Sequence, residues 1–167
     1  NYTTPTFGVV PRMVIWGLLG MAISMAMTVF AAGIPTFIKG MGGEALVAEF
    51  ATEGLSWGKF IVALSISVMM NTFFAPVFMT FHKITDAHIA ENGGSLKALI
   101  TPIDMRRQIT SLNWDRQWSF IFKKTIPLFW YPAHTITFML PGELRVLFAA
   151  LLGVALGVIL AIGARKK

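Results

Sequence analysis

Cysteine is absent from this sequence of 167 residues. Its absence excludes a disulfide framework, a thiolate metal site and a thiol nucleophile. Charge is scarce as well, because only 13% of the residues are charged, about half the share that is usual in soluble domains. The sequence also lacks zinc-ligand spacing, a nucleophile elbow, a phosphate-binding loop and a dinucleotide-binding fingerprint. We therefore predict no catalytic residues, no metal and no cofactor, and we do not expect an enzyme.

Apolar residues are what the sequence has in excess. They make up 55% of the chain, and the mean hydropathy is +0.67. A water-soluble core of this size has no use for so much apolar surface, whereas a bundle embedded in lipid must be apolar outside as well as inside. The composition predicts an all-α polytopic integral membrane protein, with residues 1–167 forming a single membrane domain in contact with the lipid bilayer.

Four segments are apolar enough, or nearly so, to cross a bilayer, which takes roughly 20 residues in a helix. They cover residues 13–38, 60–81, 125–141 and 147–164. The third is short and carries several prolines. Only the letters "PGELRV" separate it from the fourth, and such a short link is typical of an antiparallel helical hairpin. We predict four transmembrane helices.

The basic residues support this topology, because four spans place both termini and the long middle loop, residues 83–124, on one side. That side holds most of the 14 lysines and arginines: Arg12, Lys83, Lys97, Arg106, Arg107, Arg116, Lys123, Lys124, Arg165, Lys166 and Lys167. The other side holds Lys39, Lys59 and Arg145. Basic residues collect in cytoplasmic loops. We therefore predict both termini on the cytoplasmic or equivalent side of a bacterial inner membrane or an organelle inner membrane.

The middle loop mixes apolar and basic residues in "SLKALITPIDMRRQITSLNWDRQW". Ser95 could cap a helix there, and Trp114 and Trp118 lie close to Arg116. This mixture predicts an amphipathic interfacial helix that leads into the third span. The same features would suit an RNA-binding patch, but a lipid interface accounts for them, so no nucleic acid is expected as a partner.

Small residues recur at every fourth position in two of the predicted spans. Such stripes let helices approach closely in lipid, although a gap for a ligand or a lipid is an alternative. We predict packing against a neighbour in the same chain or in another copy, hence a homo-oligomer or other membrane subunits as partners. The stripe residues are Gly20, Ser24 and Thr28 in the first span, and Ala149, Gly153, Gly157 and Ala161 in the fourth.

Polar residues in or near the spans are the candidate site residues, since ionisable groups in a bilayer are expensive and usually face the interior of the bundle. They are Asn71, His82, Asp86, His134, Thr137, Glu143 and Arg145. His82 and Asp86 are four residues apart, so they lie on one helical face and could pair. His134 has three interpretations: a structural imidazole bonded to a free backbone carbonyl, a residue lining a polar path, or a ligand of a cofactor.

The segment "FWYPAHTITFMLPGELR" carries Trp130, Pro132, Phe138, Pro141 and Arg145 in an order that resembles the Mpv-seventeen/peroxisomal-membrane-protein-twenty-two family. The segment "APVFMTFHKITD", residues 75–86, is also similar to that family. The resemblance covers about 90 residues from Ala75 onward. The sequence departs from the family pattern at Tyr131, which separates Trp130 from Pro132, and in a shortened interval before Pro141. Its middle segment is also more polar than the apolar stretch that the family carries there. The resemblance implies a small four-span, channel-like protein of mitochondrial inner or peroxisomal membranes, in which the signature positions are mainly structural.

Three functions remain open from the sequence. The first is a channel- or transport-like protein, acting as an oligomer, with a polar path formed by Asn71, His134 and Thr137. The second is a non-catalytic subunit or assembly factor of a larger membrane complex. The third and least favoured is a membrane enzyme, because His82 and His134 lie at different depths, roughly 12 to 15 Å apart along the helix axes.

Overall fold

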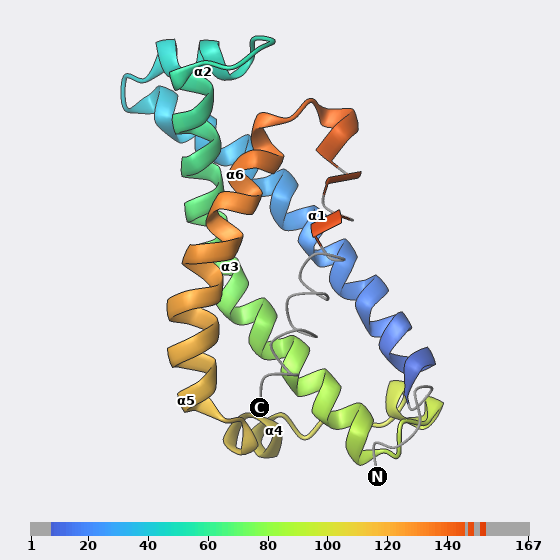
Figure 1. Ribbon diagram of the computed structural model, residues 1–167. Coiled ribbons are helices and arrows are strands. Elements are labelled where there is room, and N and C mark those ends of the chain that lie inside the picture. Colours follow the sequence, from blue (N-terminus) through green and yellow to red (C-terminus); the bar gives the residue numbers. More distant parts are fainter. Residues whose placement is uncertain (1–7, 146, 149–150, 153–167) are drawn as a thin grey trace. The chain divides into compact units, whose positions relative to one another are not determined.

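A computed structural model describes residues 8–145, 147, 148, 151 and 152. Within this part of the chain every regular element is a helix and none is a strand. The order is α1, α2, α3, η1, α4, α5, η2 and α6 (Figure 1). The predicted all-α class is confirmed.

Two of the described helices are long and apolar enough to cross a membrane, judged by length and composition. They are α1, Val9–Gly40, and α3, Trp57–Glu91. They contain the predicted spans 13–38 and 60–81, and each continues through an internal proline, Pro35 in α1 and Pro76 in α3. Between them, α2 forms a short helix, Glu44–Phe50. Within the stretches 13–38 and 60–81 both helices carry no charge and their apolar residues lie on all sides, which is typical of helices that meet apolar surroundings all round.

Both long helices end in the same backbone motif, which needs a glycine. After α1, the Gly43 N–H donates to the Ile38 carbonyl and the Gly42 N–H to the Lys39 carbonyl. After α3, the Gly94 N–H donates to the Ile89 carbonyl and the Gly93 N–H to the Ala90 carbonyl. Gly42 and Gly93 have φ of 89° and 65°, a region that glycine adopts without steric cost.

Helix α3 buries one stripe of side chains. The stripe advances by about four residues per step and includes both apolar and polar groups. In the first half of α3 its members are Val62, Ala63, Ile66, Ser67, Met70 and Asn71, and in the last turns they are Ile84, Thr85, His88 and Ile89. Because apolar residues lie on all sides of α3 between residues 60 and 81, the sequence could not show which face of that stretch is buried.

The middle loop differs from its prediction. Its first residues continue α3 as far as Glu91, and no single amphipathic helix follows. Instead the chain forms a 3₁₀ turn, η1, over Leu96–Leu99, and a short helix, α4, over Met105–Ser111. Pro102 disfavours helical backbone at the residue before it, which accounts for the break. Asp104 then begins α4, since its side chain accepts the Arg107 N–H at 3.0 Å.

The third predicted span belongs to a continuous helical run. It starts with α5, Trp114–Arg116, continues as a π-helix, η2, over Gln117–Trp130, and ends with α6, Tyr131–Met139. Asn113 caps its start by accepting the Arg116 N–H at 2.9 Å. The run therefore begins eleven residues before the predicted start at 125 and stops two before the predicted end at 141. The fourth predicted span, 147–164, lies almost wholly outside the described residues.

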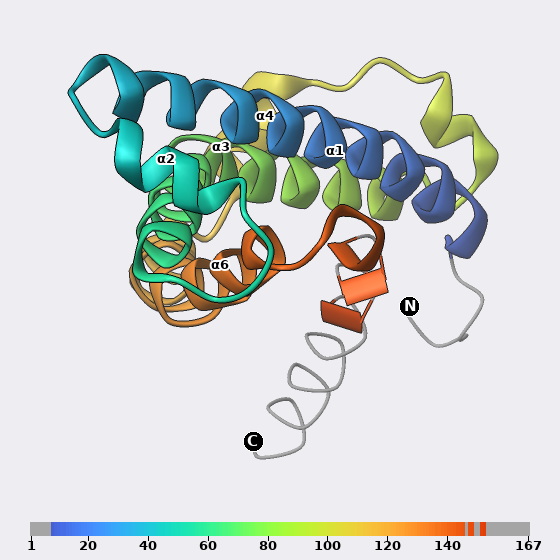
Figure 2. The same ribbon diagram turned by 90° about the horizontal axis from the view of Figure 1, so that it is seen from above.

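The chain divides into two compact units, each described by itself. The first combines residues up to Val29 with Met70–Ile126, and the second combines Phe30–Met69 with the chain from Pro127 onward. In the first unit, the beginning of α1 and the end of α3 lie side by side, as Figure 2 shows and the contacts of Arg12 and Trp16 with α3 establish. The single membrane domain stays a prediction.

Candidate functional site

Four side chains of the first unit form a cluster between the start of α1 and the end of α3. Asp86 lies 3.5 Å from the Arg12 Nε and 3.5 Å from the His82 Nε2. The Trp16 ring packs on the His82 imidazole with centroids 4.4 Å apart. The predicted proximity of His82 and Asp86 is thus seen, but Arg12 and Trp16 were not among the candidates. The sequence could have indicated Arg12 and Trp16 only if the packing of the start of α1 against the end of α3 had been known.

His82 lies one residue beyond the predicted span 60–81, on the side of the basic loop. Burial is the main cause that lowers its pKa below the ordinary value of 6.5, and the Asp86 carboxylate acts in the opposite direction. Lys83 and Arg12 lower the pKa further. Burial thus favours the neutral imidazole, and the Asp86 carboxylate at 3.5 Å is the group that favours its protonated form.

Replacing Asp86 by asparagine should lower the His82 pKa further, because the substitution removes the one charge that favours the imidazolium. An NMR titration of the His82 ring in detergent micelles measures this directly, with Lys97→Gln as a control because Lys97 is not among the groups that shift His82. An unchanged or raised His82 pKa in the Asp86→Asn protein would contradict the described contact.

Three polar residues of the apolar stretches, Ser67, Asn71 and Thr137, are buried within the protein. The Ser67 hydroxyl, fully buried, donates to the Tyr131 carbonyl at 2.8 Å, which ties α3 to the start of α6 in the second unit. The Thr137 hydroxyl is also fully buried and donates to the Ala133 carbonyl at 2.9 Å. Asn71 is 2% exposed. A residue that lines a water path must be exposed to that path. Ser67, Asn71 and Thr137 are buried within one chain, which is typical of structural residues.

Removing the Ser67 hydroxyl should cost about 0.6 kcal/mol of stability, and at most about 1.7, the average and the maximum for hydrogen bonds between helices in lipid. Ser67→Ala is compared with Ser65→Ala, whose hydroxyl donates to the Ile61 carbonyl of its own helix. Equilibrium unfolding in mixed detergent micelles gives both values. Equal losses from the two substitutions would show that the bond between α3 and α6 contributes nothing specific.

The remaining candidates of the second unit lie around α6. His134 is partly exposed, and its imidazole packs on Trp130 with centroids 5.1 Å apart. The Arg145 guanidinium donates to the Leu140 carbonyl at 2.9 Å and to the Phe138 carbonyl at 3.3 Å, so it caps the end of α6. Glu143 is exposed. Arg145 therefore has a structural role at the turn that follows the third predicted span.

The predicted packing stripe of α1 is exposed. Gly20, Ser24 and Thr28 are all exposed, and no described atom comes within 4 Å of a Cβ placed on Gly20. The residues of this part of α1 that are buried are Leu19 and Ala26. Packing of the stripe against the same chain or against another copy stays a prediction. The second stripe, Ala149, Gly153, Gly157 and Ala161, lies outside the described residues.

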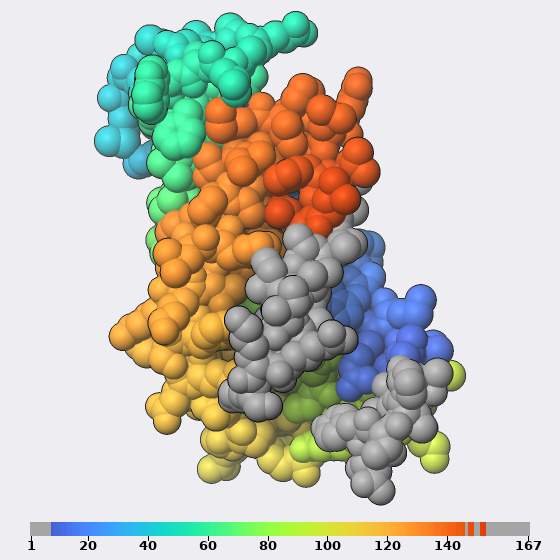
Figure 3. Space-filling view, viewed as in Figure 1, coloured from blue at the N-terminus to red at the C-terminus, as the bar shows by residue number. Residues whose placement is uncertain are grey.

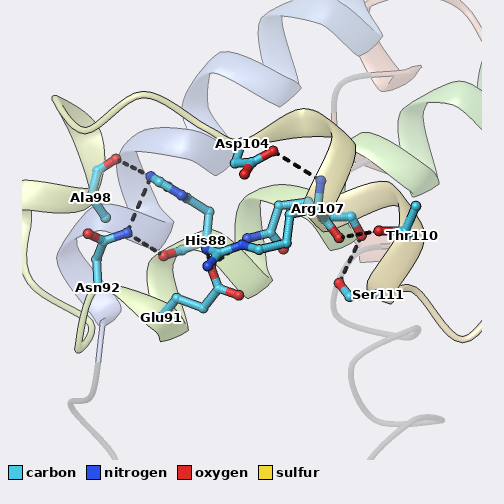
Figure 4. A network of polar contacts seen from close by, with 9 residues as sticks. His88, Glu91, Asn92, Ala98, Asp104, Arg107, Thr110 and Ser111 are labelled. Carbon is cyan, nitrogen blue, oxygen red and sulfur yellow. Dashed lines mark hydrogen bonds and ion pairs between the residues drawn. The ribbon is translucent and has the colours of Figure 1, made fainter.

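A polar network joins the end of α3 to α4 in the first unit (Figure 4). The Glu91 carboxylate pairs with the Arg107 guanidinium and accepts the Gln108 amide at 2.6 Å. Beside it, His88 is 4% exposed, and its Nε2 lies 3.2 Å from the Ala98 carbonyl and 3.4 Å from the Asn92 amide. An open pocket of about 430 Å³ lies against this network. Its lining residues are His88, Glu91, Asn92, Thr101, Pro102, Asp104 and Arg107.

The network is the part of the site that sequence reasoning missed, although Glu91, Asp104 and Arg107 all lie in the middle loop that it singled out. Within the described residues, no group of three or more His, Cys, Asp or Glu side chains could hold a metal ion. The Glu91 carboxylate is engaged with both the Arg107 guanidinium and the buried Gln108 amide, so the arrangement connects α4 to the end of α3.

Comparison with protein families, curated proteins and solved structures finds no match to this chain. The resemblance to the Mpv-seventeen/peroxisomal-membrane-protein-twenty-two family therefore stays a prediction.

Proposed function

We propose that this chain is a small, non-catalytic integral membrane protein that acts as a subunit of a membrane assembly, formed with copies of itself or with other membrane proteins. The observation that carries the proposal is helix α1. It has 32 residues, carries no charge from Met13 to Ile38, and only 11% of its most apolar stretch is buried within the protein. Such a helix is stable when its exposed faces meet lipid or another apolar helix.

The proposed topology has four spans, with both termini and residues 83–124 on the cytoplasmic or equivalent side. Helices α1 and α3 supply the first two spans, and the helical run that ends with α6 supplies the third. The uncharged sequence of residues 147–164 supplies the fourth. The proposed membrane is a bacterial inner membrane or an organelle inner membrane, and the distribution of basic residues supports this orientation.

The role of a subunit is preferred over a channel within one chain because Ser67, Asn71 and Thr137 are buried in the protein. A channel- or transport-like oligomer is the second candidate. The observation in its favour is the exposed face of α1 with Gly20, Ser24 and Thr28, where copies of the chain would meet. Kinship with the resembled family would agree with that second candidate.

Gentle detergent extraction from carbonate-washed membranes, followed by native mass spectrometry, tests the proposal. We expect the chain to stay in the washed membranes and to appear in a complex of defined stoichiometry. A lone monomer without partners would contradict the role of a subunit, and release by carbonate would contradict membrane integration. Solute flux in liposomes that hold only the purified chain would favour the channel-like candidate instead.

A further inference from the structure

The middle segment of the first unit, residues 96–124, exposes large apolar side chains that a surface in water would not tolerate in such number. Ile100 is 85% exposed, Leu96 60% and Trp118 59%. Met105, Ile109, Trp114 and Phe120 are each at least 40% exposed. The segment is coloured yellow to amber in the space-filling view, where it reaches the surface (Figure 3). Side chains of this kind, tryptophan above all, are stabilised at the boundary between lipid headgroups and acyl chains.

The same segment carries a surplus of free positive charge. Of its six basic residues, only Arg107 is in an ion pair within the described part of the chain. The other five are exposed: Lys97, Arg106, Arg116, Lys123 and Lys124. Against them stand Asp115 and Asp104, and the Asp104 carboxylate is engaged in capping α4. The segment therefore presents a positive surface.

Three aromatic and basic side chains at the start of η2 form one cluster. The Lys123 ammonium lies 5.6 Å from the centre of the Trp118 ring, and Trp118 meets Phe122 edge to face at 6.1 Å. The π-helix brings Trp118 and Lys123, five residues apart, to the same face. Tryptophan rings lie at the level of the lipid headgroups. With Trp118 at that level, the Lys123 ammonium over its ring would lie close to the lipid phosphates.

We infer that residues 96–124 form a binding surface for anionic phospholipid headgroups, an inference that rests on the proposed membrane integration. Residues 39–59, from the end of α1 to the start of α3, provide the contrast, because Lys39 and Lys59 are outnumbered there by Glu44, Glu49 and Glu53. RNA would also meet the positive charge. Lipid fits better, because RNA offers no apolar phase for Ile100 and Leu96, and because the segment runs directly into the apolar helix that ends with α6.

The test uses the purified full chain, stripped of lipid in detergent and then offered an equimolar mixture of phosphatidylglycerol and phosphatidylcholine. Native mass spectrometry counts the lipids bound. We expect phosphatidylglycerol to be enriched about fivefold or more over phosphatidylcholine, given the attraction of each basic side chain for an anionic surface. The variant Arg116→Gln, Lys123→Gln, Lys124→Gln should bring this ratio close to one.

Two further variants separate charge from folding. Arg116→Lys, Lys123→Arg, Lys124→Arg conserves the charges and should keep the enrichment, and Lys39→Gln, Lys59→Gln removes charge from the other loop and should also keep it. Equal binding of the two lipids by the unmodified chain would overturn the inference. It would also be overturned if RNA co-purified with the unmodified chain and both control variants but not with the triple Gln variant. If lipid preference is absent while the chain stays in carbonate-washed membranes, only this inference fails. Release from those membranes would overturn the proposed function with it.

Discussion

Replacing Phe138 by alanine should reduce the stability of the protein by about 3–5 kcal/mol, the usual cost of truncating a buried aromatic side chain. Phe138 is 1% exposed and lies on the inward face of α6, together with Ala133, Thr135 and Thr137. The substitution leaves a cavity that the neighbouring helices of the second unit fill only in part. The measurement is equilibrium unfolding in mixed detergent micelles.

The matched control is Phe37→Ala, also in the second unit but 62% exposed. Its cost should stay within about 0.5 kcal/mol, since an exposed side chain leaves no cavity behind. Equal losses at Phe37 and Phe138 would contradict the assignment of the buried face of α6. Phe138 is also one of the positions that the family resemblance marks as structural, and a large loss agrees with that implication.

Replacing Glu91 by alanine should cost about 2–3 kcal/mol, because it leaves the buried Gln108 amide without its acceptor and removes a charge-assisted bond to Arg107. Gln108 is fully buried, and its side-chain carbonyl already has no partner in the described part of the chain. Helix α4 would then separate from the end of α3. Unfolding in micelles measures the cost, and the rate of trypsin cleavage after Arg106 and Arg107 should rise.

Glu91→Gln should recover part of the loss, since its amide oxygen still accepts from Gln108. The control is Glu53→Ala in the loop between α2 and α3, where the side chain is exposed. Equal stability of the Glu91→Ala and Glu53→Ala proteins, with unchanged trypsin cleavage, would show that the polar network does not hold α4 in place.

Composition and charge were enough to predict the helical class and the two long helices. Long uncharged segments such as 13–38 have few alternatives to a helix, and the glycines after them end it. The charge pattern was also informative locally, because the spacing of His82 and Asp86 placed both on one face. Each of these inferences concerns one helix by itself, and the residues of that one segment are sufficient to make it.

Properties that depend on two helices could not be predicted. Apolar residues lie on all sides of α3 between residues 60 and 81, so periodicity does not reveal that Ser67 and Ile66 face inward. The partners of Asp86 and Glu91, Arg12 and Arg107, become apparent only once the elements are packed. The π-helix η2 was also not predicted, since apolar spacing over one span cannot distinguish the 3.6 residues per turn of an α-helix from the slightly larger number in a π-helix.

Membrane integration is tested most directly by the accessibility of single cysteines, for which the absence of native cysteine provides a clean background. Three variants are sufficient: Met25→Cys in α1, Glu53→Cys before α3 and Lys97→Cys in the middle loop. In sealed right-side-out vesicles, a membrane-impermeant maleimide should label Glu53→Cys alone, and Lys97→Cys should react once the vesicles are opened. Met25, although 70% exposed in the structure, should remain unlabelled until the membrane is dissolved. Labelling of Met25→Cys as fast as Lys97→Cys in opened vesicles would show that α1 faces water and would contradict the account.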